Sequence, residues 1–155
     1  MSIQSTKLRI LLNLLVYEVF LEHSSERFNN GSGVRVVPEF DTPGHTDSWG
    51  PGAGPKFLTP CYKNGQPDGT RGPINPIYQE NYDLMRKLFT EVNQVFSDSY
   101  LHLGGDEVPF GCWKSNPDIT DYMTKHNLTT YAQIEQVWVQ GLLNILNILR
   151  NFKKF

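Results

Sequence analysis

Two adjacent acids, Asp106 and Glu107, directly follow the apolar stretch 100–105, which ends in a Gly-Gly pair. An apolar run that stops at glycines is typical of a buried strand, which would here deliver both carboxylates to one site. Neighbouring like charges repel, and where water is excluded one carboxyl keeps its proton at neutral pH, as a general acid must. The pair therefore predicts an acid with a charged helper. The alternative is that both residues open a solvated loop or cap a following helix.

A second strand is expected at Val34–Phe40, which is rich in β-branched residues and precedes Asp41. A helix should follow, with Asn75 as its N-cap and Pro76 in its first turn. Its buried stripe would contain Met85, Leu88, Phe89, Val92 and Phe96. Strand, loop and helix in repetition are typical of a parallel α/β fold, in which the carboxyl ends of strands share one edge. Asp41 should therefore approach the Asp106–Glu107 pair, although about 65 positions separate them.

The remaining segments are assigned from periodicity and composition. Residues 42–76 contain seven of the 13 glycines and seven of the 10 prolines, which predicts one long irregular loop of functional importance. Helices are expected within 1–33, at 117–126 and from about residue 130 to the chain end. Asn30–Gly33 is expected to form a turn. In the last helix, Gly141 should cost about 1 kcal/mol relative to alanine. His102, inside an apolar strand, is expected to be an interior histidine.

Charge and composition exclude several classes of protein. The 155 residues carry a net charge of -2 without long runs of either sign, so no nucleic-acid partner is predicted. No apolar run is long enough to span a bilayer, and a signal peptide is not evident. No cofactor and no metal site are predicted. One alternative is a metal-dependent hydrolase that uses Asp41, His45, His102 and Asp106 as ligands.

Two long motifs occur in order along the chain, at 39–50 (Glu-Phe-Asp-Thr-Pro-Gly-His-Thr, then Ser-Trp-Gly) and at 102–107 (His-Leu-Gly-Gly-Asp-Glu). They closely resemble the family-twenty glycoside hydrolases, the β-N-acetylhexosaminidases. Residues 58–62 (Leu-Thr-Pro-Cys-Tyr) and 112–117 (Cys-Trp-Lys-Ser-Asn-Pro) resemble the animal lysosomal subunits of that family in particular. The resemblance covers about residues 34–117.

The resemblance implies an α/β fold, a partial (β/α)8 TIM barrel that is incomplete at both ends. It divides the chain into a divergent N-terminal helix and turn (1–33), a core barrel segment (34–128) and a C-terminal helix (129–155). A full barrel needs about 250 residues. Neither end of the chain resembles the family's other substrate-binding strands. The expectation is therefore a truncated form with weak or no activity, and the alternative is a non-catalytic carbohydrate-binding relative.

The resemblance also implies hydrolysis of terminal N-acetylhexosamine from glycans or glycolipids by substrate-assisted retaining catalysis, an exception to the usual two-carboxylate scheme. Glu107 matches the family's general acid. Asp106 matches the carboxylate that holds the acetamido N–H and balances positive charge. His45 matches a histidine that tunes the acid, and Asp41 is expected to orient that region.

The two cysteines, Cys61 and Cys112, are too few to define a disulfide scaffold by themselves. The resemblance implies a disulfide between them, and with it a lysosomal or secreted glycoprotein. A homodimer or heterodimer remains open. Trp49, Trp113, Phe57 and Tyr62 are candidates either for stacking on a sugar or for anchoring loops.

Overall fold

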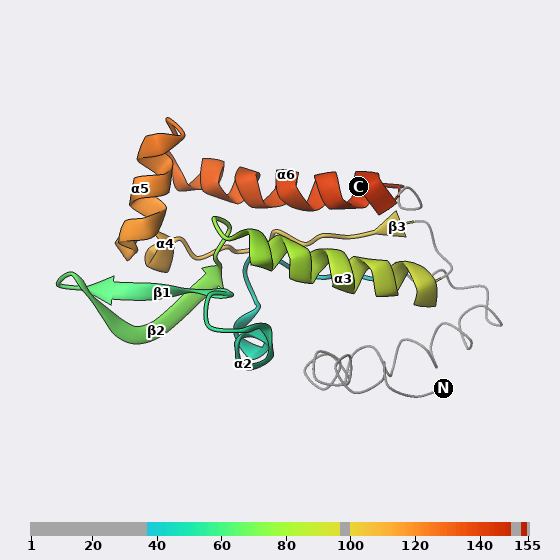
Figure 1. The fold of residues 1–155 in the computed structure, drawn as a ribbon, viewed down its shortest axis with the longest axis horizontal. Coiled ribbons are helices and arrows are strands. Elements are labelled where there is room, and N and C mark those ends of the chain that lie inside the picture. Colours follow the sequence, from blue (N-terminus) through green and yellow to red (C-terminus); the bar gives the residue numbers. More distant parts are fainter. Residues whose placement is uncertain (1–36, 97–99, 150–152, 155) are drawn as a thin grey trace.

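The computed structural model describes residues 37–96, 100–149 and 153–154. The expected N-terminal helix and turn, and the start of the Val34–Phe40 strand, lie outside the described residues. In chain order the elements are η1 (Asp47–Trp49), α2 (Gly50–Ala53), β1 (Leu58–Lys63), β2 (Gln66–Ile74), α3 (Gln79–Val95), β3 (Tyr100–Leu101), α4 (Gly111–Ser115), α5 (Pro117–Lys125), α6 (Tyr131–Leu149) and β4 (Lys153–Lys154) (Figure 1).

Three extended segments run parallel to one another. Phe40 donates its backbone N–H to the carbonyl of His102 at 3.1 Å, and His102 donates to the carbonyl of Pro38 at 3.0 Å. On its other side the second segment pairs through β3 with β4, Tyr100 opposite Lys153. The two predicted strands are therefore neighbours with the same direction, which brings the residues at their carboxyl ends to one edge.

Helices α3 and α6 lie side by side and pack against the extended segments (Figure 1). The predicted stripe of α3 is confirmed for Met85, Phe89 and Val92, which are buried, and for Phe96, which is buried directly after the helix end, whereas Leu88 is only partly buried. They join one apolar core with Phe40 and Leu101 from the parallel segments and Trp138, Leu142, Ile145 and Leu146 from α6. The Trp138 indole N–H also donates to the Thr42 hydroxyl at 3.0 Å, which fixes the end of the first segment against α6.

A β-hairpin occupies much of the expected loop, so the prediction of one irregular loop over residues 42–76 is wrong. Strands β1 and β2 pair antiparallel with Leu58 opposite Ile74. Their connection is Asn64–Gly65, and both residues have positive φ, 53° and 76°. Asparagine followed by glycine is the strongest short-range hairpin signal, because a tight primed turn needs positive φ at both positions. The high glycine and proline content obscured this signal.

Several helix boundaries differ from those expected. Helix α3 begins at Gln79, whereas Asn75 is buried before it and accepts a hydrogen bond from the Ile77 N–H at 3.2 Å. The expected C-terminal helix ends at Leu149, and 153–154 continue as a strand because they pair with β3. Helix α5 is confirmed at Pro117–Lys125. Among the described residues no helix combines the length and apolarity needed to cross a bilayer.

Candidate active site

Asp41 links the ends of the two neighbouring parallel segments. Its Oδ1 atom accepts hydrogen bonds from the backbone N–H of Gly105 at 2.9 Å and of Asp106 at 3.2 Å. Its Oδ2 atom lies 3.7 Å from Nε2 of His45. One carboxylate therefore holds both the backbone that carries the acids and the imidazole beside them, and a charged acceptor makes these hydrogen bonds stronger than neutral ones.

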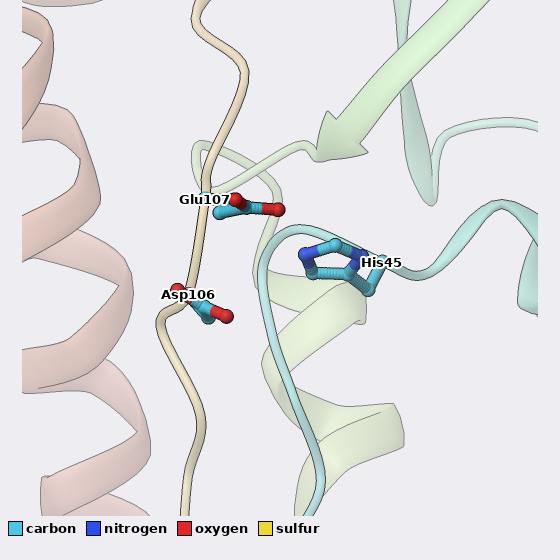
Figure 2. Close-up of side chains that lie close together, drawn as sticks. All are labelled: His45, Asp106 and Glu107. Atoms are coloured by element: carbon cyan, nitrogen blue, oxygen red, sulfur yellow. The ribbon is translucent and has the colours of Figure 1, made fainter.

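The backbone leaves strand geometry where it carries the two acids. Gly104, Gly105 and Glu107 have φ values of 70°, 103° and 44°. In a regular strand, neighbouring side chains point to opposite faces. Here the positive φ values turn the chain, so that the Asp106 and Glu107 carboxylates both point toward the His45 loop (Figure 2). Glycine adopts such angles without steric cost.

The structure brings together three of the four predicted side chains as one compact group. Donor atoms of His45, Asp106 and Glu107 all lie within 4.8 Å of one another (Figure 2). Gly44 allows this approach, because a Cβ there would lie 3.2 Å from the Asp106 carbonyl oxygen. One imidazole nitrogen and two carboxylates could serve proton transfer or hold a cation. The alternative ligand set with Asp41 and His102 is not among the groups found in the described part of the chain.

Asp106, Glu107 and His45 are all exposed. Residues 37–96 and 100–149 thus form one wall of a site and leave its acids open to water. Because water screens charges and competes for hydrogen bonds, this wall alone would act weakly on a transition state.

A cavity of about 450 Å³ adjoins Glu107 and His45 and is also lined by Asp47 and Arg71. Asp106 is not among its lining residues. A larger cavity of about 670 Å³ lies between α3 and α6 and is lined by none of the candidate acids. The larger of the two cavities is therefore not the candidate active site. Sequence reasoning did not identify Asp47 or Arg71, and their position in a glycine-rich stretch gave no signal for either.

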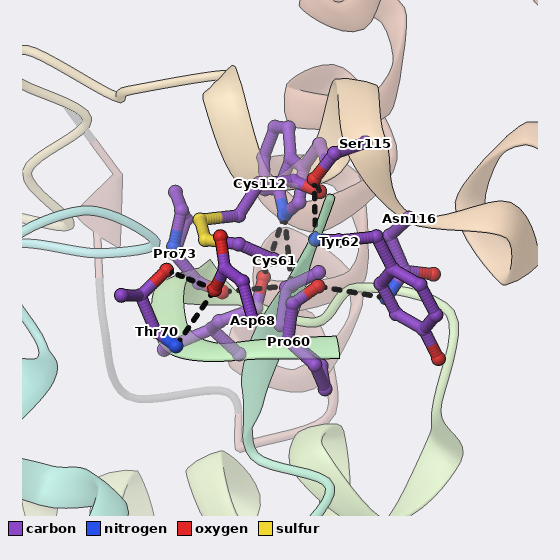
Figure 3. Close-up of a disulfide and its surroundings, with 12 residues drawn as sticks. Pro60, Cys61, Tyr62, Asp68, Thr70, Pro73, Cys112, Ser115 and Asn116 are labelled. Carbon is purple, nitrogen blue, oxygen red and sulfur yellow. Dashed lines mark hydrogen bonds between the residues drawn. A yellow bond between two sulfur atoms is a disulfide. The ribbon is translucent and has the colours of Figure 1, made fainter. Parts of the chain in front are cut away.

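The hairpin is fastened to the segment that follows Glu107. Cys61 of β1 and Cys112 of α4 form the disulfide that the resemblance implied (Figure 3). The Tyr62 N–H donates to the Ser115 hydroxyl at 2.9 Å, and the Asn116 side-chain amide donates to the Pro60 carbonyl at 3.0 Å (Figure 3). The backbone is therefore held on both sides of the two acids. Asp41 binds the backbone at Gly105, before the acids, and the disulfide holds Cys112, after them.

Three of the four aromatic candidates pack against other parts of the chain. Trp113 is fully buried, and its indole N–H donates to the Thr59 hydroxyl at 3.1 Å, so it has no free face for a sugar. Trp49 stacks on the fully buried Phe57 with ring centroids 6.1 Å apart. Tyr62 is partly buried beside α4.

The expectation that His102 is an interior histidine is wrong. Its side chain is 52% exposed, and Nδ1 lies 3.2 Å from the Glu39 carboxylate. His102 and Glu39 are paired on neighbouring parallel segments, and both point away from the core that holds Phe40 and Leu101. An alternation of apolar and polar residues, from Tyr100 onward, is the signal that could have shown this.

Known proteins that are similar to this chain are glycoside hydrolases. A family model described as "Glycosyl hydrolase family 20, catalytic domain" matches residues 26–151. The beta-hexosaminidase alpha subunit of Mus musculus is 56% identical over 115 residues, 74% of this chain and 22% of that protein. The beta subunit of Homo sapiens is 46% identical over 115 residues, 74% of this chain and 20% of that protein.

Among solved structures, the chitobiase of Flavobacterium johnsoniae superposes with a TM-score of 0.71 at 25% identity, over 85% of this chain and 20% of that one. The chain thus spans about a fifth of the length of the proteins that it matches.

Proposed function

The chain belongs to glycosyl hydrolase family 20, and on that basis we propose that it carries the catalytic acids of a β-N-acetylhexosaminidase. The reaction is hydrolysis of terminal non-reducing N-acetylglucosamine or N-acetylgalactosamine from a glycan or glycolipid. The observation that carries the proposal is the position of the Asp106 and Glu107 carboxylates on the same side of the chain, facing His45.

In this proposal Glu107 is the general acid and base. It protonates the leaving oxygen, and it later removes a proton from the incoming water. The acetamido oxygen of the substrate attacks the anomeric carbon, so the protein supplies no nucleophile. Asp106 accepts the acetamido N–H and balances the positive charge of the cyclic intermediate. Such a division of work needs both carboxylates at one sugar, which the turned backbone at 104–107 permits.

Asp41 and His45 have supporting roles in the same proposal. Asp41 accepts the N–H groups of Gly105 and Asp106, which fixes the direction in which Asp106 points. His45 lies close to the Asp41 carboxylate and to both acids, where its charge state influences proton transfer by Glu107. Positional errors of about 1 Å at such a site reduce rates by about 10²-fold, so this support belongs to the mechanism.

The fold proposed for this segment is part of a (β/α)8 barrel. Residues 38–42, 100–103 and 153–154 would be successive parallel strands, with α3 and α6 in the two connections. The boundaries 34–128 for the core segment and 129–155 for the last unit are part of this proposal. Because both acids are exposed, catalysis by these 155 residues alone is expected to be weak or absent.

The same exposure favours a second candidate function, carbohydrate binding without turnover. A bound sugar would contact one wall, and little of the substrate positioning that accelerates the reaction would remain. In either case the Cys61–Cys112 disulfide supports an oxidising compartment, lysosomal or extracellular. A homodimer or heterodimer is compatible with both functions.

The test is a comparison of Glu107→Gln with Glu80→Gln in the purified chain. Glu80 is an exposed acid of α3 that pairs with Lys56, so its substitution removes one carboxylate away from the site. Hydrolysis of 4-nitrophenyl N-acetyl-β-glucosaminide by the unmodified chain is expected to be slow; where it is measurable, Glu107→Gln should reduce it by about 10²–10⁴-fold or to below detection, and Glu80→Gln should leave it unchanged. Measurable and equal turnover by both variants contradicts the assignment of Glu107. If the unmodified chain binds N-acetylglucosamine without turnover, the second candidate function is correct.

A further inference from the structure

The connection between α5 and α6 contains the triplet Asn127-Leu128-Thr129. Asparagine followed two positions later by threonine, with a residue other than proline between them, is the acceptor motif for N-linked glycosylation. The other such triplet of the sequence, Asn30-Gly31-Ser32, lies outside the described residues. Because these triplets also arise by chance, local structure has to distinguish an acceptor from a coincidence.

Asn127 ends α5 in a left-handed backbone conformation, with a φ of 55°. Its N–H donates to the Thr124 carbonyl at 3.3 Å, and the Leu128 N–H donates to the Met123 carbonyl at 2.9 Å. These two bonds form a Schellman motif, and Leu128 packs against the apolar cluster that contains Met123. The hydrogen bonds of the motif use only the backbone of Asn127, so they do not occupy its side chain.

The residues that follow are fixed by the start of α6. Oε1 of Gln133 accepts the N–H of Thr129 at 2.7 Å and the N–H of Thr130 at 2.9 Å. The Thr130 hydroxyl in turn accepts the Gln133 N–H at 3.3 Å, which completes a capping box. The connection is therefore held at both ends, and it lies beyond the end of α5 that points away from the β1–β2 hairpin (Figure 1).

The Asn127 side chain is presented to solvent from this fixed connection. The residue is exposed, and within the described part of the chain its side chain makes no hydrogen bond, ion pair or ring contact. A group attached to Nδ2 would therefore break no interaction of the fold. Residues 126–130 do not line the cavity beside Glu107, so a glycan that begins here leaves the candidate active site open.

We propose that Asn127 is an acceptor for an N-linked oligosaccharide. The donor is an oligosaccharide carried on a lipid pyrophosphate, with N-acetylglucosamine at its reducing end. The bond from Nδ2 of Asn127 to C1 of that sugar forms, the bond from C1 to the pyrophosphate oxygen breaks, the amide loses one proton, and the lipid pyrophosphate leaves. The Cys61–Cys112 disulfide supports passage through the oxidising compartment in which this transfer takes place. The modification is independent of the roles proposed for Asp106 and Glu107.

The test uses the full chain with a secretory leader and a C-terminal tag that contains its own acceptor triplet, expressed in cultured human cells in an Asn30→Gln background. Only chains whose tag is glycosylated are analysed, because these have entered the lumen. Peptide:N-glycosidase F in ¹⁸O water converts a glycan-linked asparagine to ¹⁸O-labelled aspartate, which mass spectrometry locates in the peptide that contains residue 127. Most chains should carry the label at Asn127.

Two variants should abolish the label at this position without disturbing the fold. Asn127→Gly keeps a residue that tolerates positive φ, and Thr129→Val removes the hydroxyl of the triplet while its backbone N–H remains for Gln133. Thr129→Ser should retain the label. The matched control is Asn64→Gly, which replaces another exposed asparagine of positive φ, 53°, outside any triplet and should also retain it.

The free energy of unfolding of the unglycosylated protein from bacteria should not fall in Asn127→Gly, which shows that the variant loses the acceptor and not the helix end. Chains with a glycosylated tag and an unlabelled Asn127 overturn the proposal, and Asn127 is then only the residue that ends α5. Label that persists in Thr129→Val also overturns it, because transfer would not depend on the triplet.

Discussion

Oδ1 of Asp41 lies 2.9 Å from the backbone nitrogen of Gly105, although 64 positions separate the two residues in the sequence. The same oxygen also accepts the N–H of Asp106 at 3.2 Å. The end of one parallel segment therefore holds the end of the next at the position where the two acids leave the backbone. Loss of this contact should lower the stability of the fold and loosen the backbone that carries the two acids.

Asp41→Ala should lower the free energy of unfolding by about 1–3 kcal/mol, because it leaves two backbone N–H groups without their charged acceptor. Hydrogen exchange at the amides of Gly105 and Asp106 should also become faster. Asp83→Ala, which removes a half-exposed acid of α3 that pairs with Arg86, is the control for loss of charge. Urea unfolding and exchange of these two amides are the measurements, and equal behaviour of the two variants would contradict the role of Asp41.

Gly104→Ala should destabilise the protein far more than Gly69→Ala. Both glycines have positive φ, 70° and 88°, so alanine is strained at each by about 1–3 kcal/mol. A Cβ at Gly69 meets open space, whereas a Cβ at Gly104 would overlap the Asp41 side chain and backbone. Urea unfolding measures the loss of unfolding free energy in each variant. The part of the loss in Gly104→Ala that exceeds the loss in Gly69→Ala is due to this steric contact. Equal losses would show that Asp41 moves away without cost.

The paired variant Cys61→Ala with Cys112→Ala should lose about 4 kcal/mol of unfolding free energy, from loop entropy alone. The disulfide closes a loop with a sequence separation of 51, and this loop contains the whole of α3. Urea unfolding with and without dithiothreitol checks the value, since the reductant should destabilise the wild type and leave the paired variant unchanged. If dithiothreitol does not lower the unfolding free energy of the wild type, the disulfide is not formed in solution.

Tyr82→Phe should reduce the loss of stability in alkaline solution. Burial raises the pKa of Tyr82 well above its ordinary value, and its hydroxyl donates to the Pro76 carbonyl at 2.7 Å. The unfolded chain releases this proton near pH 10 and the folded chain does not, so unfolding becomes more favourable as the pH rises above about 10.

The free energy of unfolding, measured by urea titration at several pH values from about 8 to 11, should therefore fall more steeply in the wild type than in Tyr82→Phe. A wild-type slope in Tyr82→Phe would mean that this proton does not contribute.

The features that sequence reasoning located depend on local pattern. The stripe of α3, the helix at Pro117–Lys125 and the neighbouring parallel segments follow from periodicity and from runs of β-branched residues. The hairpin does not stand out from composition, because glycine and proline are frequent throughout residues 42–76. Its only local signal is the Asn64–Gly65 turn.

By itself the sequence determined which residues could do chemistry and that they follow strands, because residue type and apolar periodicity are local properties of the chain. The sequence also predicted that Asp41 approaches the two acids, but tertiary structure alone decided which atoms meet. It placed the Asp41 carboxylate on Gly105, turned His102 outward beside Glu39, and set Asp47 with Arg71 at one cavity. It also explains Gly141, where a Cβ would overlap the Tyr82 ring. Such encounters join residues far apart in the sequence and depend on how helices and strands pack, which local pattern does not encode.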